Sequence, residues 1–231
     1  MRLVYHVMSA PQPLGLLLLA ATDRGLRHVD FMDKKSLKRA IAAREAAEPG
    51  AHWEPSLLEL RPLADQIEEF LTGARKTIEG ALDPQGDELS LAVWKKLRAL
   101  RFGETCTVAD LARAIGQPRN LRAVAQAVLT NPLPIVVPCH RVLGADGKPS
   151  NYVGGLPRKK YLLDLEARFH KLGGLDDNRV IGELTRRVRR PITPARAVVK
   201  PAPRKRATMP SRQAATGTMS ASLKAPKKRP R

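Results

Sequence analysis

Cysteine is scarce in this sequence of 231 residues, which contains only Cys106 and Cys139. Two cysteines exclude a disulfide-rich secreted scaffold and a zinc site with four cysteine ligands. The five histidines show no close metal-type spacing, so a mixed His/Cys zinc site is not expected either. We therefore expect no metal, no cofactor and a reducing compartment, namely the cytoplasm. A nuclear location stays open.

Long hydrophobic runs are also missing. No run approaches the ~20 apolar residues that a membrane-spanning helix needs, and we expect no contact with a membrane. The segment most similar to a signal peptide is Leu14–Ala21, but it follows Pro11-Gln12-Pro13 and matches the required n-region and h-region order poorly. A buried strand is the better interpretation of this segment.

Acidic and aromatic residues are absent from residues 186–231, which we call the basic tail. The basic tail contains 15 of the 41 Lys and Arg residues, whereas residues 1–185 have a net charge of only +4. A segment of this composition cannot bury enough apolar surface to fold alone, and we expect it to be disordered. Its charge suits a polyanion: nucleic acid, an anionic membrane or an acidic protein.

Apolar patterning divides the rest of the chain into two parts. In the first part, alternating runs separated by Pro- and Gly-containing turns predict an antiparallel meander of strands followed by two helices. The strands are predicted at 3–8, 14–21 and 26–31, and the helices at 34–47 and 56–72. Gly80–Gly86 is expected to be a linker. We therefore predict a small α/β domain at 1–80, a second domain at 87–170 and a low-complexity region at 171–231.

The second part is predicted to be mainly helical. Helices are expected at 90–100, 108–115, 119–130 and 156–169, and the Gly116-Gln117-Pro118 turn gives the middle pair helix-turn-helix spacing. Thr107 is the predicted N-cap of the first of these two, with Asp110 in the capping-box position. One side of helix 119–130 is small, polar and cationic, which suits a nucleic-acid backbone. Ile135–Val137 is expected to be a buried extended segment.

Cys139 and His140 could form a nucleophilic centre. A free thiol with a pKa near 8.5 is only about 3% ionised at pH 7, so a nucleophilic cysteine needs a base. His140 is a candidate base, and Glu166 on the last predicted helix could hold the imidazole in the correct tautomer. The same residues also allow a buried structural thiol or a cysteine hydrolase, although adjacent Cys and His are not the usual geometry for hydrolases.

Two segments resemble the signature of the O6-alkylguanine-DNA alkyltransferases, or methylated-DNA–protein-cysteine methyltransferases. They are residues 131–142, NPLPIVVPCHRV, and residues 151–156, NYVGGL. The resemblance extends from about Trp94 to Ala167, and the N-terminal meander is similar to the ribonuclease H-like domain of that family. It implies an α+β fold in which a small ribonuclease H-like domain precedes a mainly helical, winged-helix-like catalytic domain.

The resemblance implies single-turnover DNA repair. In such proteins the lesion base is flipped out of the duplex, and the cysteine sulfur attacks the O6-alkyl carbon and keeps the alkyl group. By motif position, Cys139 is the acceptor, His140 deprotonates it through a water, Glu166 orients His140, and Asn131 braces the turn. The expected partner is double-stranded DNA containing O6-alkylguanine, with O4-alkylthymine as a second substrate. The protein is expected to be a monomer.

The resemblance also assigns the contacts with DNA. Arg122 matches an arginine that fills the space of the flipped guanine, and Lys159 matches a lysine that supports the leaving guanine. The expected DNA-binding residues are Arg122, Ala123, Gln126, Arg119 and Arg141, and the expected base-pocket residues are Tyr152, Val153, Val142 and Lys159. Val108 departs from the family pattern, which has a tyrosine there that contacts the phosphate and the base.

The alternative is a non-repairing, DNA-binding relative that marks alkylated bases or regulates transcription. Such relatives lack the cysteine, whereas this chain has Cys139. With DNA as the partner, the basic tail is expected to be a non-specific tether. A nuclear-targeting signal and an inert extension are the other interpretations of the tail.

Overall fold

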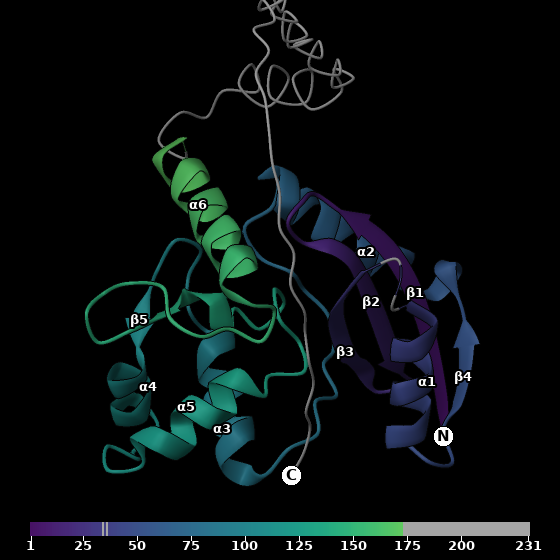
Figure 1. Ribbon diagram of the computed structural model, residues 1–231, viewed down its shortest axis with the longest axis horizontal. Helices are drawn as coiled ribbons and strands as arrows, with labels where there is room; N and C mark the ends of the chain where they lie inside the picture. The colour runs from purple at the N-terminus through teal and green to yellow at the C-terminus, as the bar shows by residue number, and fades with distance from the viewer. Residues whose placement is uncertain (34, 36, 173–231) are drawn as a thin grey trace, which may run out of the picture. The chain divides into compact units, whose positions relative to one another are not determined.

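The computed structural model describes residues 1–33, 35 and 37–172, which belong to one compact unit (Figure 1). A four-stranded sheet with its helices is followed by a mainly helical second half, as the predicted α+β fold class requires. The predicted low-complexity region at 171–231, including the basic tail, lies outside the described residues except for residues 171 and 172, which are helical. No helix of the described residues is both long and apolar enough to cross a membrane.

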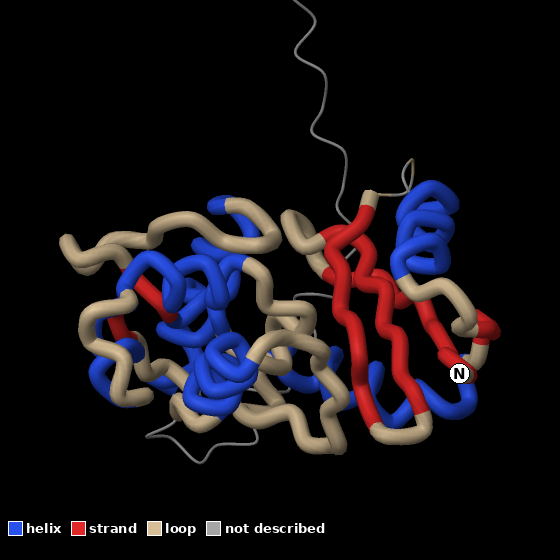
Figure 2. The backbone as a smooth tube through the Cα atoms, turned by 90° about the horizontal axis from the view of Figure 1, so that it is seen from below, coloured by secondary structure: helices blue, strands red, loops and turns tan. Residues whose placement is uncertain are grey.

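The N-terminal sheet, whose strands are red in Figure 2, has the strand order β3-β2-β1-β4 (Figure 1). Its antiparallel meander consists of β1 (Arg2–Ala10), β2 (Gly15–Thr22) and β3 (Gly25–Met32), which confirms the three predicted strands. β2 lies between β3 and β1, and its residues 17–20 are fully buried. A strand that is covered on both faces has a continuous apolar run instead of an alternating pattern. β4 (His52–Pro55) pairs in parallel with β1 and was not predicted.

Helix α2 (Leu57–Thr72) covers one face of this sheet. Ser56 caps its first turn by accepting a hydrogen bond from the Glu59 N–H, and Gly73 ends it in the left-handed conformation that glycine adopts without steric cost. Its buried side chains are Leu60, Ala64, Ile67, Phe70 and Leu71. At about 1.5–3 kcal/mol for each fully buried large side chain, this packing fixes α2 on the sheet.

The other face of the sheet is covered by polar contacts and one indole ring. Trp53 on β4 packs with Leu3 and Ala20 in a small cluster of its own. Helix α1 (Leu37–Ala47) buries no side chain and is held by an ion pair between Arg44 and Asp30 on β3. An ion pair rather than apolar burial therefore attaches α1 to the sheet.

The second half begins with α3 (Glu88–Arg98) and continues with the predicted helix-turn-helix, α4 (Val108–Ala114) and α5 (Leu121–Leu129). Thr107 and Asp110 form the predicted capping box at the start of α4. On α3, the indole Nε1 of Trp94 donates a hydrogen bond of 2.8 Å to the backbone oxygen of Ala127 on α5. This bond ties α5 to the helix behind it.

Short elements connect α5 to the last helix. The 3₁₀ turn η1 (Cys139–Arg141) runs directly into β6 (Val142–Leu143), which pairs in parallel with β5 (Cys106–Thr107). Helix α6 (Leu156–Leu172) then closes the second half. The predicted nucleophile thus lies on a tight turn between a helix and a short strand.

The two halves share one hydrophobic core and several backbone hydrogen bonds. Residues 81–83 of the predicted linker lie along β3, where Leu26 N–H donates to Ala81 O at 3.0 Å and Asp83 N–H donates to Leu26 O at 2.8 Å. The Val29 N–H of β3 also donates to Pro132 O at 2.8 Å. The sheet is therefore bonded directly to the segment that leads to Cys139.

Candidate active site

Cys139 lies at the start of η1 and is 1% exposed. The segment before it is buried as predicted, but the predicted extended conformation of Ile135–Val137 is wrong. The chain turns there, with hydrogen bonds of 2.8 Å from Val137 N–H to Leu133 O and from Cys139 N–H to Val137 O. Ile135 has a φ of +74°, which a β-branched residue rarely adopts. A buried apolar run has the same pattern in a turn as in a strand, which explains the error.

The side chain of Asn131 closes this turn. Its Nδ2 donates to Val137 O at 2.9 Å and lies 3.1 Å from the sulfur of Cys139, and its Oδ1 accepts from the Leu133 N–H at 3.0 Å. Asn131 is 2% exposed, so these bonds form away from water and hold the thiol in one position. The structure thus places Asn131 beside the sulfur.

His140 is fully buried and pairs with Glu166 of α6. Its Nε2 lies 2.7 Å from Glu166 Oε1, and its Nδ1 has no hydrogen-bond partner among the described residues. The Glu166 carboxylate also accepts from Arg141 Nε at 2.9 Å and from the Gly103 N–H at 2.9 Å. Glu166 therefore fixes the imidazole and links η1 to the loop before β5.

Arg141 was expected on the DNA-binding surface, and this expectation is wrong. The side chain is 4% exposed and forms a buried ion pair with Glu166, while its Nη1 donates to Leu100 O at 2.7 Å. Its guanidinium also lies 5.9 Å from the centre of the Phe102 ring. A buried arginine needs a paired carboxylate, and Glu166 supplies it.

The protonation states follow from burial and from these partners. Burial raises the pKa of the Cys139 thiol to about 11, although Asn131 and the nearby Lys159 act in the opposite direction. Burial also lowers the pKa of His140, against the opposing effect of Glu166. Burial tends to raise the pKa of Glu166, but the hydrogen bonds and charges of His140 and Arg141 outweigh this effect and lower the pKa to about 2. At neutral pH the site contains a thiol, a neutral imidazole and a carboxylate.

Four predicted base-pocket residues lie around the same turn. Tyr152 is 8% exposed, and its ring stands edge-on to that of His140 at 6.4 Å. Lys159 is fully buried; its ammonium donates to Val142 O and, at 3.3 Å, to Asn151 O. Burial lowers the pKa of Lys159. Val153 is 45% exposed, at the open side of this group.

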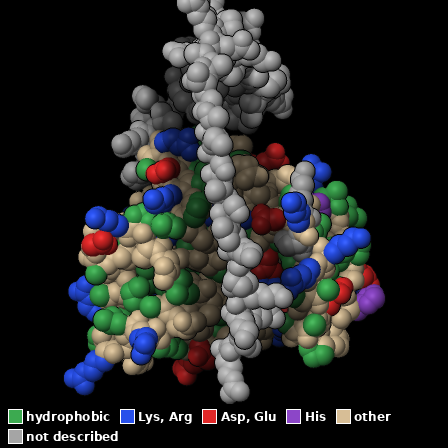
Figure 3. All heavy atoms as spheres, viewed as in Figure 1, with side chains coloured by type: hydrophobic (Ala, Val, Ile, Leu, Met, Phe, Trp, Pro, Cys, Tyr) green, Lys and Arg blue, Asp and Glu red, His purple; other side chains and the backbone are tan. Residues whose placement is uncertain are grey.

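The remaining predicted DNA-binding residues form one surface on and before α5. Arg119, Arg122, Ala123 and Gln126 are exposed and, with Asn120, line a shallow hollow of about 480 Å³. The surface over α4 and α5 shows Lys and Arg side chains at its edges with hydrophobic side chains between them (Figure 3). A surface with cations at its edges suits a phosphate backbone.

Known protein families match both halves of the chain. Residues 3–84 match the ribonuclease-like domain of 6-O-methylguanine DNA methyltransferase, and residues 88–168 match the DNA binding domain of the same protein. The chain belongs to the 6-O-methylguanine DNA methyltransferase family. The resemblance stated from the sequence is thereby confirmed.

Individual members of the family are similar over most of their length. The methylated-DNA–protein-cysteine methyltransferase of Methanosarcina barkeri is 40% identical over 162 residues, which cover 70% of this chain and 96% of the relative. That of Mycobacterium tuberculosis is 34% identical over 162 residues, which cover 70% and 92%. The crystal structure of Mycobacterium tuberculosis OGT in complex with DNA matches with a TM-score of 0.60 and 31% identity, covering 73% of this chain and 94% of that one.

In this methyltransferase fold, the sequence did not predict the backbone groups that bind Glu166 and Arg141. Gly103 contributes only its backbone N–H, and Leu100 only its carbonyl oxygen, so the side chains contain no signal for either role. Arg141 carried a signal, since an arginine beside a buried histidine can pair with the carboxylate that orients it. Within the described residues, no cluster of His, Cys, Asp and Glu could hold a metal ion.

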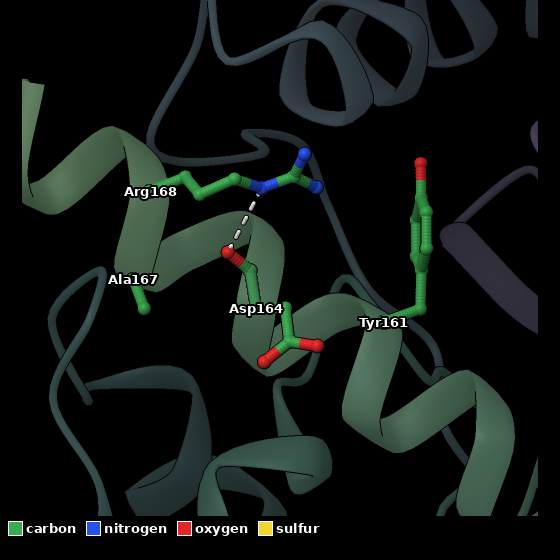
Figure 4. Close-up of a pocket in the computed structure, with 4 residues that line it drawn as sticks. All are labelled: Tyr161, Asp164, Ala167 and Arg168. Atoms are coloured by element: carbon green, nitrogen blue, oxygen red, sulfur yellow. Dashed lines mark hydrogen bonds between the residues drawn. The ribbon is translucent and has the colours of Figure 1, made fainter.

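Another hollow, of about 500 Å³, is lined by Tyr161, Asp164, Ala167 and Arg168 (Figure 4). All four residues belong to α6, and Arg168 Nε donates to the backbone oxygen of Asp164 at 3.2 Å (Figure 4). Among the described residues the lining is the outer surface of one helix, and no second element there could enclose a ligand. Cys139 and its neighbours remain the candidate site.

Proposed function

We propose that this protein repairs DNA by transferring an alkyl group from O6 of guanine to the sulfur of Cys139. The observation that carries the proposal is a buried thiol next to a histidine that is fixed at Nε2 by Glu166 and unpartnered at Nδ1 among the described residues. A nitrogen in this state can accept a proton. Membership of the methyltransferase family supports the same activity.

In the proposed reaction, the bond from Sγ to the alkyl carbon forms as the bond from that carbon to O6 breaks. The thiol has a pKa of about 11, so it must lose its proton as it attacks. The proton passes to Nδ1 of His140, through a water, and the adjacent carboxylate of Glu166 stabilises the imidazolium. The guanine leaves with the electron pair on O6, supported by the ammonium of Lys159, and then takes up a proton.

The base must first leave the duplex. Flipping costs a few kcal/mol, which an inserted side chain can offset. Arg122 is exposed on α5 and is the proposed inserted residue. We propose Arg119, Ala123 and Gln126 as its neighbours on the DNA, and Tyr152, Val153, Val142 and Lys159 as the base pocket. O4-alkylthymine is the proposed second substrate.

The proposal extends to organisation and location. We assign transfer and DNA binding to residues 87–170, the ribonuclease-like domain to 1–80 and a separate role to 171–231. Matches of residues 3–84 and 88–168 to two family domains support the first two assignments. We also propose a monomer located in the cytoplasm; free thiols at both Cys106 and Cys139 support the reducing compartment. Light scattering after gel filtration tests the monomer.

The decisive experiment follows a radiolabelled methyl group from O6-methylguanine in duplex DNA to the protein. We expect transfer that stops at one label per chain and that Cys139→Ser abolishes, because a hydroxyl is a far weaker nucleophile than a thiol. Cys106→Ser is the control: Cys106 is half-buried on β5, outside the group formed by Asn131, His140 and Glu166, and the variant should keep full transfer.

Each other outcome rejects the proposal in a recognisable way. Label on Cys139→Ser would move the acceptor to Cys106. DNA binding without transfer would support the non-repairing relative, and repeated turnover would support a hydrolase.

A further inference from the structure

The base-pocket segment 151–155 is in contact with the N-terminal sheet. Phe31, near the end of β3, lies with its ring centre 5.9 Å from that of Tyr152, at an interplanar angle of 59°. Tyr152 in turn stands edge-on to His140. A side chain from the first half of the chain therefore supports an aromatic ring that touches the active-site histidine.

Gly154 shows how closely Phe31 approaches this segment. A Cβ atom at position 154 would lie 2.6 Å from two carbons of the Phe31 ring and 2.9 Å from Tyr152, distances that real Cβ atoms do not show. Only glycine therefore fits between the two rings without a shift. The backbone after Tyr152 lies directly against the face that Phe31 provides.

Arg158 also contacts both Phe31 and the base-pocket segment. Its guanidinium lies 5.1 Å from the centre of the Phe31 ring, within the range of a cation–π interaction. Nη1 donates to Gly154 O at 3.0 Å, while Nε donates to Pro13 O at 3.1 Å. One arginine thus joins the base-pocket turn to the β1–β2 turn and to Phe31.

We propose that Phe31 is a positioning residue of the base pocket, which holds Tyr152 and the Gly154 turn where the flipped base is received. This inference rests on the proposed function. Phe31 meets the active-site histidine through Tyr152, so it acts on binding of the base. The ribonuclease-like half then contributes to the pocket of the catalytic half.

The test uses free O6-benzylguanine, which requires no flipping, with the full-length protein. Aromatic pairs are worth about 0.5–1.5 kcal/mol beyond area burial, so Phe31→Ala should raise the half-saturating concentration up to roughly 10-fold. The limiting rate should stay within about twofold of the wild-type rate, and its pH profile should not change, because the thiol and its base are untouched. Phe31→Leu should raise the half-saturating concentration less than Phe31→Ala does. A double variant with Tyr152→Ala should be no worse than Tyr152→Ala alone.

Trp53→Leu is the matched control, since Trp53 is a buried aromatic of the same sheet that packs in a separate cluster. It should lower the free energy of unfolding without changing the half-saturating concentration. The inference would be overturned if Phe31→Ala and Trp53→Leu raised the half-saturating concentration equally. It would also be overturned if Phe31→Ala changed only the limiting rate.

Hydrogen exchange gives a readout that does not depend on transfer. The Gly155 N–H donates to Tyr152 O at 2.9 Å, and this bond closes the turn that Phe31 supports. Phe31→Ala should accelerate exchange of residues 153–156, and Trp53→Leu should not. If the wild type fails to react with the base, the proposed function fails, but the exchange result still decides the role of Phe31. Unchanged exchange in Phe31→Ala would refute it.

Discussion

At the scale of single residues, Glu166 determines the electrostatics of the site. Its carboxylate accepts hydrogen bonds from His140, Arg141 and the Gly103 N–H while only 1% of the residue is exposed. Breaking a buried ion pair from one side leaves the other charge without compensation. Glu166 is therefore expected to stabilise the fold as well as to orient the histidine.

Glu166→Gln tests this stabilisation. At pH 7 the variant should lose about 3 kcal/mol of unfolding free energy, because Arg141 stays buried without a carboxylate. The pKa of Glu166 is lowered from 4.5 to about 2, so its contribution is complete above pH 4.5. As the pH falls from 4.5 toward 2, the unfolded chain binds the proton first and the contribution is lost. Urea unfolding of the wild type and the variant at pH 7, 5 and 3 measures the difference in free energy of unfolding, which should be smaller at pH 3.

Glu59 provides the control. It pairs with Arg2 at 2.8 Å on the surface, with 45% of its side chain exposed. Glu59→Gln should leave the free energy of unfolding nearly unchanged at every pH, because water screens an exposed pair. Equal effects of the two substitutions would mean that the buried network adds no stability.

Which of these residues could be predicted depends on whether their role uses a side chain in a motif. Asn131, Cys139 and His140 lie in the NPLP and PCHRV segments, and Glu166 on the last helix follows from the need of the histidine for a group that orients it. Arg141 lies in the same motif and was predicted on the DNA-binding surface. Its burial depends on meeting Glu166, which is distant in sequence, and the neighbouring His140 is the local signal for that pairing.

At the scale of elements, α5 presents the surface that we propose for DNA. Arg122→Ala should slow repair of O6-methylguanine in duplex DNA by roughly 10- to 100-fold, because the cost of flipping, a few kcal/mol, is no longer offset. Reaction with free O6-benzylguanine should be unchanged, since it needs no flipping. The ratio of the two rate constants is the measurement.

Arg113→Ala is the control for this helix surface. Arg113 is also an exposed arginine and lies on the neighbouring α4, where it pairs with Asp110. Its removal should leave the ratio of rate constants close to that of the wild type. Equal losses on both substrates in Arg122→Ala would show that Arg122 supports the fold instead of the base stack.

The elements that were predicted correctly have strong periodicity or caps, such as the meander and the Thr107 capping box. β4 was missed because its four residues, HWEP, have no apolar alternation, and it forms by pairing with β1. The turn at Ile135 was missed because a buried apolar run looks the same in a turn as in a strand, and the bonds that fix the turn come from one nearby side chain and one distant backbone group. Asn131 bonds to Val137, and Pro132 accepts from Val29 of the sheet.

At the scale of the whole molecule, the charge is divided unequally. Residues 1–185 have a net charge of +4, and the basic tail contains 15 Lys and Arg residues without an acidic residue. Such a segment can bind DNA without sequence preference by releasing counterions from the phosphates. We therefore expect the search for damage to depend on the tail and the transfer step to depend on the folded body.

Deletion of residues 186–231 tests this division. If about four of the 15 cations bind phosphates at once, the slope of log affinity against log salt should flatten by about 3–4 units on undamaged duplex DNA. Reaction with free O6-benzylguanine should not change. A tail of the same length with every Lys and Arg replaced by Gln should behave like the deletion. Identical salt slopes for the full-length and truncated proteins would exclude a tether.

The positions of the two tryptophans provide the molecule with an optical probe in each half. Trp53 lies in the small cluster of the sheet, and Trp94 donates its indole hydrogen to Ala127 of α5. Indole emission shifts with the polarity and hydrogen bonding of the ring. In a Trp53→Phe protein, all tryptophan fluorescence comes from a ring bonded to the helix that carries Arg122. Movement of that helix on duplex DNA then becomes visible in real time, without any attached dye.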